Sequence, residues 1–278
     1  MPAALVVPPH SFEVPPVGGH RLTATVEVAW LHANGTLVVP PGTTDLLIEI
    51  GANSRNTMDI ETLPKKPHSY LVTFEPILDK YASLLARNSH ADQKSPLGRH
   101  HARGTVLPYA VAAEDGFATF HMSPIDGCSS LMDTSGFSKM GGSCSPNNVN
   151  WKEERRVPTV SLNTILSKWL AWEGGGGWPV SQLKIDAQGF DIGIFDTLRG
   201  TKLMERIQTV EMETTRDGCT LMYNTTGKGA FCSHMIKQMA GYGYKAFWRG
   251  QPAQCHRMKF TGAKGCETEL TFTRDASI

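Results

Sequence analysis

The stretch DLLIEIGAN, residues 45–53, decides the fold, because it is a nearly continuous apolar run that ends at a glycine. Such a run is typical of a parallel strand buried on both faces of a sheet. A second apolar run, residues 70–74, ends in Glu75 and Pro76, and apolar residues at helical spacing follow it up to Arg87. The chain therefore begins to alternate strand and helix, which predicts an α/β domain.

Working outward from this stretch, the alternation continues to the end of the chain. We expect further strands at 105–112, 117–122, 182–186, 207–213, 244–248 and 269–273, and helices from Ser161 toward Trp172, over 190–198 and over 230–240. This order predicts a single doubly wound domain with a mostly parallel sheet over residues 41–278.

Two regions lack this pattern. Residues 1–22 are rich in Pro, Gly and His, which predicts an irregular arm, and residues 23–39 predict a hairpin about Asn34 and Gly35. We therefore treat residues 1–40 as an N-terminal arm and hairpin. Residues 123–156 carry no regular period, which predicts a long loop that covers the active site.

Composition excludes several classes of protein. The 278 residues include 27 Lys and Arg against 26 Asp and Glu, a net charge of +1, so no strong field favours nucleic acid as a partner. The apolar runs fall short of the roughly 18 to 20 residues that a membrane helix needs, and the first residues do not resemble a signal peptide. We expect a globular protein without a transmembrane segment.

The six cysteines lie in the second half of the chain without a C-x-x-C pair, so no zinc site is expected. Neighbours could pair as 128/144, 219/232 and 255/266 in an oxidising compartment, or all six could be reduced thiols. Asn34 and Asn224 begin glycosylation sequons. The sequence slightly favours the cytoplasm, allows the secretory pathway, and determines no oligomeric state.

The ends of the expected strands carry the candidate chemistry. A turn at Gly51 places backbone N–H groups at the carboxyl edge of the sheet, where ligands bind. Glu75 lies 24 residues further on, close to the separation of about 20 in ribose-binding folds. Glu75 also suits the N-terminus of a helix with Pro76 in its first turn, and the two roles are compatible. Asp186, followed by Gly189, ends another buried strand.

Several segments together carry a resemblance to a known family. They are residues 48–53, Phe74-Glu75-Pro76, 110–112 with 116–120, 160–163, Lys184-Ile185-Asp186 with Gly189, 198–200 and Glu211. In order and spacing this set, covering roughly residues 36–213, resembles the FkbM-type S-adenosylmethionine-dependent methyltransferases.

The resemblance implies a Rossmann-like class I methyltransferase domain, with a seven-stranded sheet and S-adenosyl-L-methionine as cofactor over its first two strands. It also implies O-methylation, with a hydroxyl of a small metabolite or glycan as acceptor. It assigns the methionine part of the cofactor to Gly51, Ala52 and Asn53, the ribose to Glu75, the adenine to Glu114 or Asp115, and the methyl donor, the substrate or both to Asp186.

Methyl transfer to a hydroxyl also needs a base, for which the candidates are Asp186, Asp133 and His121. His121 has the most suitable side chain near neutral pH, although a lone histidine at a strand end is more often structural. The Arg and His residues near 90–103 suit an anionic substrate better than a metal, and no metal is expected. Trp169 and Trp172 suit either a sugar ring or the core.

The sequence departs from the family pattern where the substrate is expected. Arg55 replaces a glycine, and it either points to solvent or holds a carboxylate, phosphate or sulfate. Gln188 replaces a glutamate, for which Asp191 offers a substitute. If these changes abolish transfer, the protein is a non-catalytic binding protein with the same fold. A nicotinamide-dependent oxidoreductase ranks last, because G-x-G-x-x-G is absent.

Overall fold

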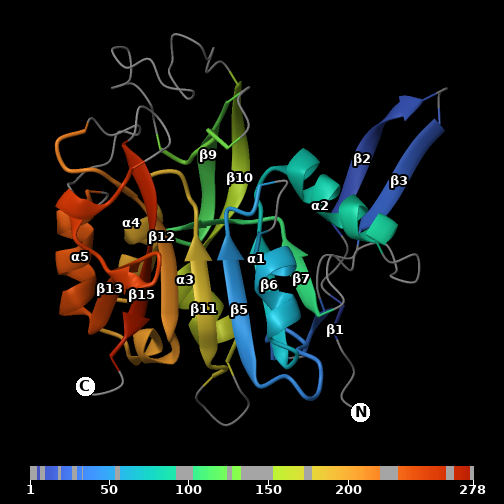
Figure 1. Ribbon diagram of the computed structural model, residues 1–278. Coiled ribbons are helices and arrows are strands. Elements are labelled where there is room, and N and C mark those ends of the chain that lie inside the picture. Colours follow the sequence, from blue (N-terminus) through green and yellow to red (C-terminus); the bar gives the residue numbers. More distant parts are fainter. Residues whose placement is uncertain are drawn as a thin grey trace.

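The computed structural model describes residues 5–6, 10–17, 20–26, 30–32, 34–53, 57–91, 103–123, 127–132, 153–171, 177–219, 231–260 and 266–275. At its centre is an eight-stranded sheet in the order β14-β13-β15-β12-β11-β5-β6-β7 (Figure 1). Five neighbouring strands are parallel, namely β12 (Thr209–Thr215), β11 (Val180–Ile185), β5 (Asp45–Ile50), β6 (Ser69–Phe74) and β7 (Gly104–Leu107). Three antiparallel strands complete it: β15 (Glu267–Arg274), β13 (Tyr244–Trp248) and β14 (Gln251–Pro252).

The mostly parallel α/β sheet agrees with the sequence prediction, but the expected number of seven strands is wrong. The additional strand is β14, a two-residue edge strand paired with the end of β13. Between them lie Arg249 and Gly250, both with positive φ (49° and 76°). A two-residue turn with positive φ at both positions matches the twist of an antiparallel pair, so the chain folds back at once.

Both faces of β5 are buried, as expected of a doubly wound sheet. On one face Leu47 packs with Met58, Leu63 and Leu71, which come from α1 (Thr57–Glu61), the 3-10 turn Leu63–Lys65 and β6. On the other face alternate β5 residues pack in the main core with α3 (Leu162–Thr164) and the π-helical turn Ile165–Trp169. In Figure 1, α1 lies in front of the sheet and α3 behind it.

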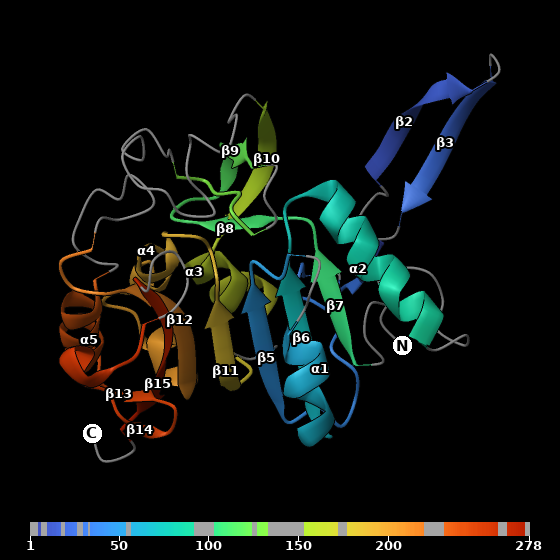
Figure 2. The same cartoon turned by 45° about the horizontal axis from the view of Figure 1, so that its top comes forward.

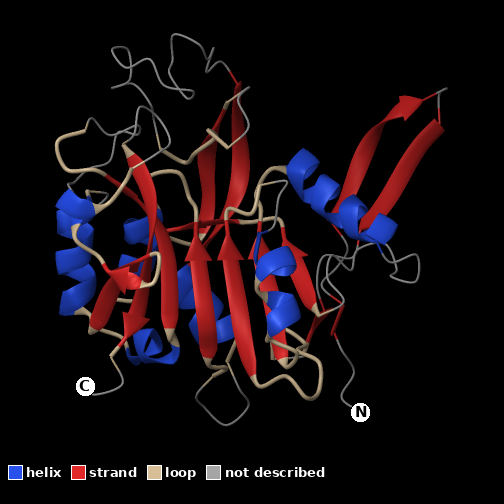
Figure 3. Ribbon diagram, in the orientation of Figure 1, coloured by secondary structure: helices blue, strands red, loops and turns tan. Residues whose placement is uncertain are grey.

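The remaining helices are α2 (Leu78–Ala91), α4 (Asp191–Asp196) and α5 (Cys232–Gly241), with 3-10 turns at Lys202–Arg206 and Cys255–Arg257 (Figure 3). The helices expected at these places are present with slightly different ends. Within the described part of the chain, no helix is both long and apolar enough to cross a membrane.

A second, three-stranded sheet contradicts two details of the prediction. The single strand expected at 105–112 divides at Pro108 into β7 and β8 (Ala110–Ala112), because proline lacks the N–H that a continuous ladder needs. Part of the loop expected over 123–156 belongs to β10 (Glu153–Ser161), which lies between β8 and β9 (Gly116–Met122). Figure 2 shows this small sheet above the carboxyl ends of the central strands.

The N-terminal region also differs from the prediction. Residues 1–22 were expected to be irregular, yet β2 (His10–Val17) and β3 (His20–Val26) form an antiparallel hairpin, which projects from the central sheet (Figures 1 and 2). Its two consecutive prolines fall in a bulge between Val14 and Val17, where no ladder N–H is needed. Two short strands, β1 (Leu5–Val6) and β4 (Trp30–Leu31), also pair. The expected pairing of 23–29 with 37–39 is therefore wrong, although Gly35 does form a turn.

The structure contains disulfides, but two of the pairs predicted from neighbouring positions are wrong. Cys219 is bonded to Cys266, and Cys232 is bonded to Cys255. The pairing of β12 with β15 aligns Thr215 with Glu267, and this alignment brings Cys219 close to Cys266 although the segment that contains α5 separates them in the sequence. Cys128 is disulfide-bonded as well, whereas Cys144 lies outside the described residues. Such bonds are compatible with a secreted protein.

Candidate functional site

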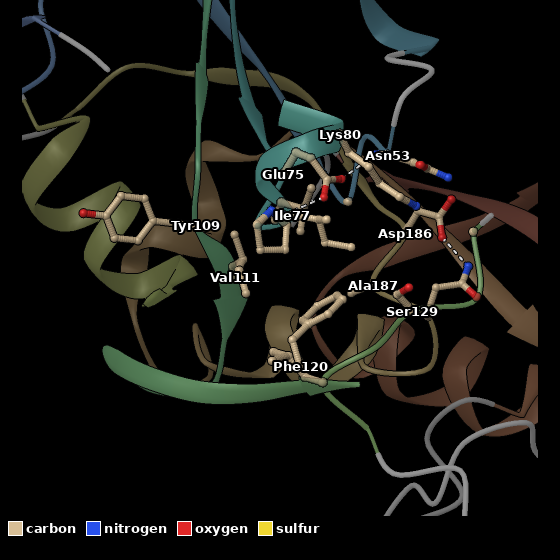
Figure 4. A pocket seen from close by; sticks show the side chains of 17 residues that line it. Asn53, Glu75, Ile77, Lys80, Tyr109, Val111, Phe120, Ser129, Asp186 and Ala187 are labelled. Atoms are coloured by element: carbon tan, nitrogen blue, oxygen red, sulfur yellow. Dashed lines mark hydrogen bonds between the residues drawn. The ribbon is translucent and has the colours of Figure 1, made fainter. Parts of the chain in front are cut away.

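A cleft lies at the carboxyl ends of three neighbouring strands, β11, β5 and β6 (Figure 4). Gly51 and Asn53 line it after β5, Glu75 lines it after β6, and Asp186 lines it after β11. The cleft is open to solvent, and the space inside it, its mouth included, amounts to about 600 Å³. The sheet thus brings together residues that lie up to 135 positions apart in the chain.

Glu75 forms the buried wall of this cleft, with only 3% of its surface exposed. Its Oε2 accepts a hydrogen bond from the Asn53 N–H at 2.7 Å, and its Oε1 accepts one from the Ile77 N–H at 2.9 Å. Burial raises the pKa of the Glu75 carboxyl to about 7, against the opposing effect of these two bonds and of the charge on Lys80. The carboxylate therefore joins the end of β5 to the start of α2.

Gly51 is required by the close approach of two strand ends. Its φ is +77°, and a Cβ at this position would lie 1.9 Å from the carbonyl oxygen of Asp186. The Asp186 N–H donates to the carbonyl of Ile50 at 3.0 Å, which holds the end of β11 against the end of β5. Only glycine fits there, so the turn predicted from the sequence is a packing requirement.

Gln188 orients the carboxylate of Asp186. The Gln188 Nε2 donates to Asp186 Oδ1 at 2.8 Å, and the Gln188 carbonyl accepts from Ser130 Oγ at 2.9 Å. A glutamate at position 188 would place a second carboxylate against Asp186, whereas the amide supplies a donor. The Gln188 side chain therefore holds the Asp186 carboxylate in place at the cleft, whereas the contact with Ser130 uses the backbone carbonyl and does not depend on this departure from the family pattern.

The remaining cleft residues were missed in the sequence. Ile77, Val111 and Phe120 form an apolar side, Lys80 reaches in from α2, and Tyr109 lies at the edge. The alternation of β9 was the available signal, because it directs Phe120 and its neighbour His121 to opposite faces of the small sheet. Three residues of the expected covering loop, Gly127, Ser129 and Leu131, do line the cleft.

Trp169 belongs to the core in this structure. Its ring stacks against Phe74 with centroids 6.5 Å apart, and Tyr109 meets it edge-on at 5.3 Å. Trp169 does not line the cleft; it supports Tyr109, which does.

Five of the expected site residues lie outside the cleft lining, namely Ala52, Glu114, Asp115, His121 and Asp191. Ala52 is buried with Tyr81, Leu84 and Val106 in a small core cluster. Glu114 and Asp115 are exposed. His121 Nδ1 lies 3.6 Å from Glu154 Oε1 on β10.

Asp115 has a structural contact that the sequence did not indicate. Its Oδ1 accepts from the Ser161 N–H at 2.8 Å, and its Oδ2 accepts from Thr164 Oγ1 at 2.7 Å. Ser161 itself caps α3, as expected, by accepting from the Thr164 N–H. Asp115 therefore fixes the start of α3 beneath the small sheet.

Asp191, the proposed substitute for a family glutamate, is buried at the start of α4 and does not line the cleft. Its Oδ1 has no hydrogen-bond partner among the described residues. Burial and the charge of Asp186 raise the pKa of the Asp191 carboxyl to about 8. Arg55 and Asp133 lie outside the described residues, and so do His100 and His101.

The described residues include no group of three or more His, Cys, Asp or Glu side chains arranged to hold a metal ion. The cleft chemistry available in this part of the chain consists of carboxylates, one ammonium group, backbone N–H groups and an apolar side. Such a set suits a ligand that carries hydroxyl groups and a flat apolar part.

Comparison with known families decides the assignment. The model of the methyltransferase FkbM domain matches residues 49–246, which is most of the chain. This chain belongs to the FkbM methyltransferase family. The matched region contains every residue that lines the cleft, from Ile50 to Gln188, and the resemblance identified from the sequence motifs is confirmed.

Solved structures of low identity are also similar to this FkbM methyltransferase. A fibrillarin/Nop5p complex is 11% identical with a TM-score of 0.37, covering 87% of this chain and 77% of that chain. TnmH is 9% identical (TM-score 0.34; 84% and 50% covered). A 16S rRNA (adenine(1408)-N(1))-methyltransferase from Catenulisporales acidiphilia is 9% identical (TM-score 0.36; 87% and 97% covered). At these values the likenesses carry no argument, and no curated protein matches the chain.

Proposed function

We propose that the protein transfers a methyl group from S-adenosylmethionine to a hydroxyl of a small metabolite or glycan. The observation that carries the proposal is the meeting of Glu75 and Asp186 in one cleft, at the carboxyl ends of β6 and β11. Ligands of open α/β sheets bind at this edge, outside the carboxyl ends of the strands. The family assignment supports methyl transfer in general.

The residues present fit the cofactor. Both Glu75 oxygens keep lone pairs beyond the two N–H groups they accept from, so ribose hydroxyls can donate to them. The apolar side formed by Ile77, Val111 and Phe120 suits a flat base such as adenine. When bound, S-adenosylmethionine supplies an electrophilic methyl group on a sulfonium centre. The carboxylate of Asp186 suits a positive charge there.

The reaction then asks little of the protein beyond position and a proton acceptor. A bound donor would supply the methyl group to the acceptor hydroxyl oxygen and would leave as S-adenosylhomocysteine once its carbon–sulfur bond is broken. The hydroxyl proton passes to a carboxylate oxygen of Asp186. Gln188 Nε2 donates a 2.8 Å hydrogen bond to Oδ1 of Asp186 and so holds the carboxylate in one orientation. Asp133 remains another candidate for the base, whereas His121 lies against Glu154 outside the cleft lining.

Ligand binding separates the enzyme from the alternative of a non-catalytic binding protein. We expect the purified protein to bind S-adenosylmethionine and S-adenosylhomocysteine with micromolar affinity in calorimetry. Transfer of a labelled methyl group to hydroxylated metabolites and glycans would identify the acceptor. Asp186→Asn should keep the calorimetric affinity for the uncharged S-adenosylhomocysteine within a few-fold and lower the transfer rate by about 100-fold or more, as expected for loss of a general base.

Two results would contradict the proposal. If the protein bound neither S-adenosylmethionine nor S-adenosylhomocysteine, the cofactor assignment would be wrong and the non-catalytic alternative would be favoured. Near-normal transfer by Asp186→Asn would show that another group takes the proton. Glu205→Gln is a suitable control, since Glu205 is exposed and does not line the cleft.

A further inference from the structure

Lys80 is a cleft residue to which neither the sequence motifs nor the proposed function assigns a role. It lies in the first turn of α2, is partly buried, and lines the cleft together with Glu75 and Asp186. In Figure 4 the Lys80 side chain extends from α2 toward Asp186, so the ammonium group and the carboxylate point toward one another. A cation from one side of the cleft therefore faces an anion from the other.

The charges of the described cleft are few. Among its lining residues the charged side chains are Glu75, Lys80 and Asp186, and the positive charge of Lys80 also lowers the pKa of the Glu75 carboxyl. Lys80 thus lies within electrostatic reach of both acids. Asp79, its neighbour on α2, acts on Glu75 in the opposite direction. Lys80 is the cation of this part of the cleft, and Asp186 is the acid that it faces.

We infer that Lys80 makes the cleft discriminate against a positive charge on a ligand next to Asp186. A ligand that is neutral at that point leaves Lys80 facing Asp186. A ligand that is cationic there must share the carboxylate with Lys80 and meet its repulsion, which is strong where water is partly excluded. Lys80 is therefore a specificity-determining residue for the charge state of the bound ligand.

This inference rests on the proposed function, which supplies a pair of ligands that differ in the required way. S-adenosylmethionine carries a methyl group and a positive charge on sulfur. S-adenosylhomocysteine lacks both and is otherwise identical. Methyl transfer removes that charge. The repulsion from Lys80 is therefore present before transfer and relieved by it, which destabilises the bound donor relative to the transition state.

The test compares the two dissociation constants in each variant. Calorimetry gives the affinity for S-adenosylmethionine divided by that for S-adenosylhomocysteine. Lys80→Met keeps the aliphatic stem and removes the charge, so this ratio should rise by about tenfold, the effect of roughly 1.4 kcal/mol. Lys80→Arg keeps the charge and should keep the wild-type ratio. Lys202→Met, at an exposed lysine outside the cleft, should also leave it unchanged.

The outcomes separate this inference from the proposed function. A wild-type protein that binds neither ligand overturns both. Binding of both ligands with an unchanged ratio in Lys80→Met overturns the inference and leaves the proposed function standing. Equal weakening of both ligands in Lys80→Met also overturns it, because Lys80 would then hold a part that the two share. Thermal unfolding checks that each variant is folded, and Lys80→Gln replaces any Lys80→Met protein that is not.

Discussion

Glu75 at the end of β6 and Asp191 at the start of α4 are equally buried, each with 3% of its surface exposed, yet their surroundings differ. Both oxygens of Glu75 accept backbone N–H groups, and the pKa of this carboxyl rises from 4.5 to about 7. Asp191 has one oxygen without a partner among the described residues, and burial, together with the nearby charge of Asp186, raises the pKa of its carboxyl from 3.8 to about 8.

The difference in hydrogen-bond partners and in position indicates which of the two buried acids is available for ligand binding. A raised pKa means that the native state keeps a proton that the unfolded chain has released, so the free energy of unfolding falls as the pH rises. This loss runs from about pH 4.5 to 7 for Glu75 and from about pH 3.8 to 8 for Asp191. Both acids therefore destabilise the fold near neutral pH. Only Glu75 faces the cleft.

The largest effect is expected at the glycine next to the Glu75 wall. Gly51→Ala places a methyl group 1.9 Å from the Asp186 carbonyl at a positive φ, so the ends of β5 and β11 must separate. We expect a loss of about 3 kcal/mol in the free energy of unfolding and no measurable binding of S-adenosylhomocysteine. Urea unfolding and calorimetry measure the two effects.

Gly42→Ala is the matched control for this change. Gly42 also has a positive φ, +86°, but an added Cβ would meet nothing within 4 Å. It should lose only about 1 kcal/mol and bind normally. Equal effects of the two substitutions would show that backbone conformation, and not the contact between β5 and β11, makes Gly51 necessary.

The next effect concerns the acid that faces the cleft. Glu75→Gln replaces an acceptor oxygen by an amide that cannot accept from ribose, so the affinity for S-adenosylhomocysteine should fall more than tenfold. In the wild type this affinity should fall as the pH drops below about 7, because Glu75 then becomes protonated. The variant should lack this dependence.

Calorimetry between pH 5.5 and 8.5 checks both statements about Glu75. Stability should change less than affinity, because loss of one hydrogen bond and removal of a buried charge oppose one another. An unchanged affinity in Glu75→Gln would refute the ribose assignment.

The smallest effect is expected at the acid outside the cleft. Asp191→Asn retains the shape and removes a charge that burial disfavours, so the variant should be more stable than the wild type by on the order of 2 kcal/mol at pH 9. The difference should vanish toward pH 4, where the wild-type carboxyl is protonated. Urea unfolding at pH 4, 7 and 9 measures this trend, and a variant less stable than the wild type at pH 9 would contradict it.

Much of the fold could be predicted from local patterns. The run 45–53 with Gly51, and the Glu75 that follows the next strand, indicated two parallel strands and their ligand-binding edge. A strand that is buried on both faces is a continuous apolar run in the sequence, so it can be recognised without knowledge of its tertiary contacts. Pro108 was a local signal for the division between β7 and β8, because proline lacks the N–H that a continuous ladder needs. The strand β10 could not be predicted, because short strands of a small sheet depend on partners from distant parts of the chain.

Arg206 shows the same limit for a single side chain. Its guanidinium donates to the carbonyls of Leu166, Leu170 and Trp178 at 2.6–3.0 Å, and a Cβ on Gly177 would collide with it. Nothing in the sequence near position 206 indicates these partners. Carbonyls carry no residue-specific signal, so only the tertiary structure identifies the contact.

The sequence by itself determined the α/β class, the family and the convergence of Gly51, Glu75 and Asp186, because parallel strands end at one edge of a sheet. The tertiary structure decided which other expected residues reach the cleft. It directed His121 toward Glu154, used Asp115 to fix α3 and buried Asp191. It also turned Lys80 toward Asp186. The physical reason is that side-chain direction and burial depend on packing between elements distant in sequence, which local periodicity does not encode.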